Sequence, residues 1–245
     1  MPAAIVIGAG PGIGTSVAQR FAREGLAVAV LARSPRTVDA ALAALAQAQV
    51  QTLGLTVDVT DEAGLRAALD EAVGRLGVPE VLVYNAALIQ SDVLGELTAR
   101  QHLDAWAVDV VGAITAITHL GPAMTEAGEG TILITGGMPE PLPEATSLSL
   151  GKAGVRALTE LLARAYEPAG VHVATVTVAG AVAPGSAFDP DEIAEEYWRL
   201  HAQRAGSWER EVLYAARPAP AAAGQAAERA RPRPAAGCRE VEAAG

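Results

Sequence analysis

Short apolar runs alternate along the chain with longer segments in which apolar residues recur at helical spacing. The short runs are continuously apolar, which is typical of strands buried on both faces of a parallel sheet. Strand and helix follow each other in order, so the sequence predicts an α/β fold with a doubly wound parallel sheet. The predicted strands cover residues 3–7, 26–31, 51–57, 81–84, 131–135 and 171–178, the predicted helices cover 12–24, 35–48, 61–76, 98–127 and 144–168, and a short helix follows Pro190.

Composition indicates one folded domain followed by a tail. Of the 245 residues, 51% are hydrophobic and 19% are charged, which is enough apolar material for a large buried core. After Tyr214 the sequence becomes mostly Ala, Pro, Arg, Gly and Glu with no periodic apolar face, a composition typical of disorder. We therefore expect a single domain over residues 1–215 and a disordered Ala/Pro/Arg-rich tail over 216–245.

Charge and cysteine content narrow the class of ligand and the location. The formal net charge of −10 opposes binding to nucleic acid or to an anionic membrane, so a small-molecule substrate is the better expectation. No uncharged apolar stretch reaches the ~18 to 20 residues that a membrane helix needs. The one cysteine, Cys238, excludes an internal disulfide and favours a cytoplasmic location. We predict no metal site.

A glycine-rich loop joins the first predicted strand to the first predicted helix. Residues 8–14 read Gly-Ala-Gly-Pro-Gly-Ile-Gly. Glycine is needed where the backbone turns sharply, approaches a pyrophosphate or packs a helix closely on a strand. The start of the following helix supplies free N–H groups to phosphates. The loop therefore predicts a dinucleotide site.

The spacing of these glycines resembles the short-chain dehydrogenase/reductase family. The resemblance extends over roughly residues 3–185 and includes motifs after the third and fourth strands. It implies a Rossmann-type NAD(P)-binding domain, although Ala87 replaces the glycine of the family's Asn-Ala-Gly motif. The cofactor-binding residues that the resemblance implies are Gly8, Gly12, Ile13, Gly14, Asp58, Val59, Asn85, Ala86 and Lys152.

The end of the second strand favours NADP(H) over NAD(H). NAD-preferring enzymes place an acidic residue there on the ribose hydroxyls. This chain has Arg33 followed by Ser34 instead. Arg33 can offer a planar fork of donors to the 2′-phosphate and Ser34 a hydroxyl, so NADP(H) is the expected cofactor. An ordinary solvated arginine is the alternative.

The proton-transfer machinery departs from the family. Lys152, the one lysine of the chain, falls where the family's Tyr-x-x-x-Lys helix is expected. There the lysine contacts the nicotinamide ribose and lowers the pKa of a tyrosine one helical turn earlier. Leu148 stands at the tyrosine position, and leucine cannot transfer a proton.

Several residues could substitute for the tyrosine, and the sequence does not choose among them. Thr135 is the hydroxyl at the end of the fifth strand, where the family has a serine that polarises the substrate oxygen. Asp109 stands where the family has an asparagine that helps to hold a proton-relay water, and an ion pair with Lys152 is its alternative role. Ser149 could orient the substrate oxygen. Thr135, Ser149, Asp109 and Lys152 are thus the catalytic candidates, with Tyr84, His102, His119, Ser147 and Tyr197 as weaker ones.

The resemblance implies a function and an assembly. We expect an NADP(H)-dependent oxidoreductase with an atypical active site, with residues 184–214 as an aromatic-rich substrate lid. Packing of these aromatic residues onto the domain is the alternative. The rival function is a non-redox nucleotide-binding protein: a cofactor sensor, a scaffold subunit or an enzyme of another class. The helices before and after the fifth strand would suit a homo-oligomer, a dimer or tetramer.

Overall fold

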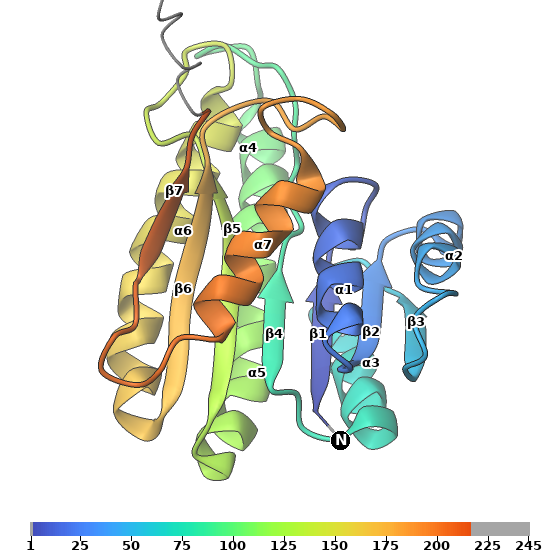
Figure 1. Cartoon of the computed structure of the whole chain (residues 1–245). Coiled ribbons are helices and arrows are strands. Elements are labelled where there is room, and N and C mark those ends of the chain that lie inside the picture. Colours follow the sequence, from blue (N-terminus) through green and yellow to red (C-terminus); the bar gives the residue numbers. More distant parts are fainter. Residues whose placement is uncertain (1, 217–245) are drawn as a thin grey trace, which may run out of the picture.

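The computed structural model describes residues 2–216, so the predicted tail lies outside the described residues except for residue 216. Seven strands form one sheet in the order β3-β2-β1-β4-β5-β6-β7, and every neighbouring pair is parallel (Figure 1). The doubly wound parallel sheet and all six predicted strands are confirmed. The strands are β1 (Ala3–Ile7), β2 (Ala27–Ala32), β3 (Thr52–Thr56), β4 (Val81–Tyr84), β5 (Gly130–Gly137), β6 (Val171–Val178) and β7 (Glu211–Tyr214).

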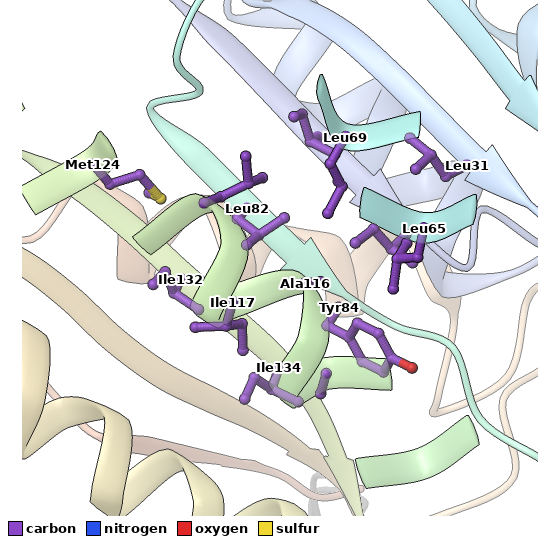
Figure 2. Close-up of a cluster of buried hydrophobic side chains, with 14 of the residues drawn as sticks. Leu31, Leu65, Leu69, Leu82, Tyr84, Ala116, Ile117, Met124, Ile132 and Ile134 are labelled. Atoms are coloured by element: carbon purple, nitrogen blue, oxygen red, sulfur yellow. The ribbon is translucent and has the colours of Figure 1, made fainter. Parts of the chain in front are cut away.

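Helices cover both faces of the sheet, which explains the continuously apolar strands. In β1, for example, Ile5 and Ile7 face one core while Ala4 and Val6 face the other. The first core lies beneath α3, α5 and α6, and Figure 2 shows its centre around Leu82. The second lies beneath α1, α2 and α7. The helices are α1 (Ile13–Arg23), α2 (Pro35–Ala44), α3 (Glu62–Leu76), α4 (Ala99–Trp106), α5 (Gly112–Ala127), α6 (Thr146–Tyr166) and α7 (Pro190–His201), and a 3₁₀ turn, η2 (Glu167–Ala169), follows α6.

The predicted helix over 98–127 is observed as one helical stretch, Ala99–Ala127, whose hydrogen-bonding pattern changes in the middle. A π-helical segment, η1 (Ala107–Val111), separates α4 from α5 and carries Asp109. Such segments insert an extra residue into a helical turn and are frequent at functional sites. The stretch Ala99–Ala127 also has the length and apolarity of a membrane span, but 56% of its apolar window is buried, and a core helix meets the same criteria.

Most of the segment predicted as a substrate lid lies in the body of the domain. Helix α7 places Ile193, Tyr197 and Leu200 in the second core against α1, and β7 extends the sheet beside β6. Trp198 meets Phe21 edge to face with ring centroids 5.9 Å apart. The aromatic residues of α7 therefore pack onto the domain, and the loop between β6 and α7 is what remains over the strand ends (Figure 1).

Candidate active site

The strand order reverses between β1 and β4, and the glycine loop lies at this point. Gly8 has φ +85°, and a Cβ there would collide with the backbone of Ala86. A Cβ at Gly14 would collide with the carbonyl oxygen of Gly8, which accepts a hydrogen bond of 2.7 Å from Asn85 Nδ2. Asn85 thus fixes the loop from the neighbouring strand, and glycine is required at both positions.

Gly12 forms the open side of this loop. Its φ is +120°, and a Cβ built there would meet only Val182 Cγ1, at 4.0 Å. It is the N-cap of α1 and provides no side-chain cap, so the first turn of the helix begins beside open space. A bare helix start with room above it fits a pyrophosphate. The residues at this end of the sheet therefore fit a dinucleotide, as the sequence predicts.

The residues after β2 suit the adenosine end of such a ligand. Arg33 is exposed, and Ser34 caps α2 by accepting a hydrogen bond of 3.2 Å from the Thr37 N–H. Arg36, which sequence reasoning missed, lies in the first turn of α2 and lines a cavity of about 650 Å³ together with Gly12. The signal was present as a second arginine three residues after the first.

Asp58 lies after β3, close enough to Arg33 for the charge of that arginine to act on its carboxylate. Its Oδ1 accepts hydrogen bonds of 2.9 Å from the Thr60 N–H and 2.8 Å from the Thr60 hydroxyl. These bonds, with a smaller contribution from the positive charge of Arg33, lower the pKa of Asp58. The carboxylate is therefore held ionised at the edge of the proposed adenosine site.

Lys152 lies at the same end of the sheet, on α6. Its side chain is buried, and Nζ donates a hydrogen bond of 2.7 Å to the carbonyl oxygen of Thr135 in β5. Burial lowers the pKa of Lys152 from 10.5 to about 8, and the negative charge of Asp109 opposes that shift. Gly137 packs beside the lysine stem, because a Cβ there would lie 3.7 Å from Lys152 Cγ and Cε and from the Val178 carbonyl oxygen. The lysine can therefore gain or lose a proton near neutral pH.

Asp109 is the acidic partner of this lysine. Its Oδ1 accepts a hydrogen bond of 2.7 Å from the Leu88 N–H, while Oδ2 is the one buried side-chain oxygen or nitrogen in residues 2–216 without a hydrogen-bond partner. Burial raises the pKa of Asp109 from 3.8 to about 6. A Cβ at Gly151 would collide with Oδ2, so the glycine makes room for the carboxylate against α6, next to Lys152.

Thr135 joins several parts of the site through its own polar groups. Its hydroxyl donates a hydrogen bond of 2.8 Å to Asn85 Oδ1 and therefore accepts one of 2.6 Å from the Tyr197 hydroxyl. Its carbonyl accepts from Lys152. The structure thus places the predicted Thr135 beside Lys152 and Asn85 but commits its hydroxyl to the framework. Sequence reasoning did not find this role of Tyr197.

Two serines of α6 anchor the neighbouring loops. The Oγ of Ser149 accepts a hydrogen bond of 3.0 Å from the Leu142 N–H in the loop after β5. The hydroxyl of Ser147 donates one of 2.6 Å to Asp92, a buried residue from the loop after β4. Asp92 also accepts from the Ser147 N–H at 3.0 Å. Sequence reasoning missed Asp92, because a contact across 55 residues leaves no local pattern.

Arg156 was also missed. One turn after Lys152 on α6, its Nη1 donates hydrogen bonds of 3.0 Å to the carbonyl oxygens of Gly137 and Met138. Met138 has φ +46°, a left-handed conformation that is rare for residues other than glycine. Arg156 therefore stabilises the sharp turn by which the chain leaves β5.

The remaining candidates are either committed to the framework of the domain or lie away from Lys152. The Tyr84 hydroxyl donates a hydrogen bond of 2.5 Å to the Val108 carbonyl within the first core, and burial raises the pKa of Tyr84 (Figure 2). Tyr197 is buried in the second core, and burial raises its pKa as well. His119 Nε2 lies 2.7 Å from Asp70 Oδ1 between α5 and α3, and His102 lies on α4. Within residues 2–216, no three His, Cys, Asp or Glu residues gather to hold a metal ion.

The chain is similar to known short-chain dehydrogenases and reductases in both sequence and fold. The sequence matches the family described as short chain dehydrogenase over residues 2–187. It is 33% identical over 190 residues to cis-4-hydroxycyclohexanecarboxylate dehydrogenase of Sinomonas cyclohexanicum, covering 76% of this chain and 74% of the relative. It is 34% identical over 191 residues to a putative ketoacyl reductase 2 of the granaticin polyketide synthase of Streptomyces violaceoruber, covering 75% and 72%. A metagenomic short-chain oxidoreductase in complex with NADP has the same fold, with a TM-score of 0.79 and 24% identity over 86% of this chain and 96% of that one.

Proposed function

The chain belongs to the short-chain dehydrogenase family, and on that premise we propose that it is an NADP(H)-dependent oxidoreductase acting on a small-molecule substrate. The observation that carries the proposal is the juxtaposition of an open glycine cradle with a buried lysine. Gly12 follows β1 and Lys152 reaches Thr135 in β5, so both lie at the carboxyl end of the parallel sheet, where α/β folds of this kind bind their ligands.

The cofactor-binding part of the proposal rests on the glycine loop and two arginines. The glycine loop and the start of α1 would hold the pyrophosphate, and Arg33 with Arg36 would hold the 2′-phosphate. The solved complex of a family member with NADP supports the same choice of cofactor. When bound, NADP(H) would supply the hydride chemistry.

The protein's own residues would supply the proton and would hold the groups around the substrate in position. Leu148 has no proton to give, so the proton would come from Lys152, directly or through water. A lysine whose pKa is about 8 exchanges its proton near neutral pH far more readily than one at 10.5. The negative charge of Asp109 would raise the pKa of Lys152 and so favour its protonated form. Thr135 and Ser149 would act by holding Lys152 and the loop after β5 in place.

The rival, a non-redox nucleotide-binding protein, has less support. The relatives that cover three quarters of this chain are named dehydrogenases and reductases. A pair of buried ionisable groups is also an expensive feature for a scaffold to retain. Turnover of NADPH with a carbonyl compound distinguishes the two functions.

We propose further that the protein is a cytoplasmic homo-oligomer. The helical face over α4, η1, α5 and α6 exposes large apolar side chains, which are typical of an interface between copies. Light scattering on the purified protein tests this. The exposed residues of this face are Leu103, Trp106, Val111, Ile114 and Leu161.

The cofactor proposal predicts that single changes at the two arginines weaken NADPH binding selectively. Arg33→Ala and Arg36→Ala should each raise the Kd of NADPH about tenfold, or about 1.4 kcal/mol, because each removes a charged donor from the 2′-phosphate. The Kd of NADH should change little. Fluorescence titration measures both constants.

Arg75→Ala provides the matched control, because Arg75 lies at the far end of α3 and pairs only with Glu71 in its own helix. Equal losses for NADPH and NADH in the Arg33 and Arg36 variants would contradict selection by the 2′-phosphate. No binding of either nucleotide by the wild type would overturn the oxidoreductase proposal.

A further inference from the structure

Three loops form the rim of the proposed site at the carboxyl ends of β4, β5 and β6 (Figure 1). They comprise residues 85–98, 138–145 and 179–189, here called the rim loops. The first two lie side by side, because Asp92 and Ala145 form an isolated β-bridge and the Asp92 N–H donates to the Glu144 carbonyl at 3.1 Å. The third comes close to the glycine loop through Val182 and Gly12. Substrate approaching Lys152 would pass between these loops.

The rim loops expose an unusual amount of apolar side chain. Loops of soluble proteins rarely gather several exposed large aliphatic residues unless they bind something. Leu94 and Ile89 are the two most exposed large apolar residues described, at 85% and 80%. The others of this group are Val93, Leu142 and Val182.

Charge in the rim loops is of one sign. They contain no lysine, arginine or histidine, but five acidic residues. The nearby cations are engaged elsewhere. Arg36 lines a cavity with Pro184 and Asp189 of the third loop but is assigned to the 2′-phosphate of the cofactor. Arg156 uses Nη1 on the carbonyls of Gly137 and Met138, and the Lys152 ammonium is buried against the Thr135 carbonyl. An anionic substrate would therefore meet repulsion without a compensating cation. Of the five, Asp92 is buried and bound to Ser147, while Glu96, Glu140 and Glu144 are exposed and Asp189 is half-buried.

We infer that the site takes an uncharged, largely apolar carbonyl compound, or the alcohol related to it, and discriminates against carboxylates and phosphates. The inference rests on the proposed function and deepens it. Reduction converts such a ketone to a secondary alcohol: the carbonyl carbon takes a hydride from NADPH, which becomes NADP⁺, and the oxygen takes one proton. The apolar chain of the substrate covers Ile89, Val93 and Leu94, which removes their surface from water.

A pair of ketones of equal chain length, one ending in a methyl group and the other in a carboxylate, tests the inference. With NADPH, kcat/KM for 2-octanone should exceed that for 7-oxooctanoate by about 100-fold, because the carboxylate loses its hydration beside acidic loops. Binding without turnover is measured as the shift in Tm of the NADP⁺-loaded protein, which 2-octanone should raise and 7-oxooctanoate should not.

Val93→Ser and Leu94→Ser should each raise the KM for 2-octanone about tenfold and leave the Kd of NADPH unchanged. Val78→Ser is the matched control: Val78 is 42% exposed and Val93 51%, but Val78 precedes β4 at the opposite end of the sheet. It should change neither quantity.

The outcomes separate this inference from the proposed function. If the wild-type protein did not bind NADPH, the proposed oxidoreductase function would be wrong. NADPH binding with equal or better use of 7-oxooctanoate, or equal Tm shifts by the two ketones, would overturn the substrate class alone. A change in oligomeric mass of the Val93 and Leu94 variants, with ketone binding intact, would identify the rim as a contact between copies and overturn the inference as well.

Discussion

Replacing Lys152 with methionine should lower turnover about a thousandfold while leaving the folded protein at least as stable as the wild type. Methionine fills the space of the lysine stem without its charge. Because burial holds the folded-state pKa of Lys152 at about 8 instead of 10.5, charging this lysine costs roughly 3 kcal/mol of stability below pH 8. The cost fades as pH rises from 8 to 10.5. Loss of the hydrogen bond to Thr135 offsets about 1 kcal/mol of the gain.

Two measurements on the same variant distinguish a catalytic lysine from a structural one. Urea unfolding at pH 7 and pH 10 gives the stability difference, which should favour the variant at pH 7 and shrink at pH 10. NADPH oxidation with the preferred ketone gives turnover. A variant that is inactive because it is less stable at pH 7 would show that Lys152 supports the fold, and an active, stable variant would remove it from the mechanism.

Most of the sheet could be predicted from the sequence because its central strands are buried on both faces and therefore read as runs of apolar residues. β3, with the sequence TLGLT, is an edge strand that is half-buried or exposed, and its place between two predicted helices indicated it instead. β7 (Glu211–Tyr214) was not found because it is a four-residue edge strand whose side chains alternate between exposed and half-buried. It follows α7, which packs in the second core, and it pairs with β6, so its place in the sheet depends on tertiary contacts.

The nucleotide end of the site was predictable for a different reason. Backbone constraints fix residue identity there: Gly8 and Gly14 have no room for a Cβ, and Asn85 bonds the loop directly. Because these backbone constraints require glycine at fixed positions, the spacing of the glycines in the sequence indicates the loop. Arg36 follows Arg33 by three residues, but no backbone constraint fixes its identity, so this spacing alone did not single it out.

The roles of the residues around Lys152 depend on tertiary contacts that cannot be seen in the sequence. Thr135 and Ser149 were predicted as catalytic from their hydroxyls, but whether a hydroxyl is free depends on its partners. Tyr197 and Asn85 occupy that of Thr135, and Leu142 that of Ser149. Asp109 and Lys152 were predicted as possible neighbours, and in the structure the π-helical segment η1, which carries Asp109, packs against α6, which carries Lys152.

Replacing Asp109 with asparagine should stabilise the protein by about 2 kcal/mol above pH 6 and have little effect near pH 4. Its folded-state pKa is raised from 3.8 to about 6, so the folded protein binds the proton more tightly than the unfolded chain. Stability therefore falls as pH rises from 4 to 6, by roughly 3 kcal/mol in all, and that loss persists at higher pH. Asparagine keeps the acceptor for the Leu88 N–H but buries an amide N–H₂ that offsets about 1 kcal/mol.

The same change should lower turnover and shift its pH profile, because the lysine loses the negative charge that raises its pKa. The apparent pKa governing kcat at alkaline pH should move from about 8 to a lower value in Asp109→Asn. Asp104→Asn is the matched control, an exposed carboxylate on α4 that pairs with Arg100. Since a buried charge pair reduces stability, a variant more stable and less active than the wild type would mean that the pair is present for its chemistry. A less stable variant with an unchanged pH profile would assign Asp109 to the fold.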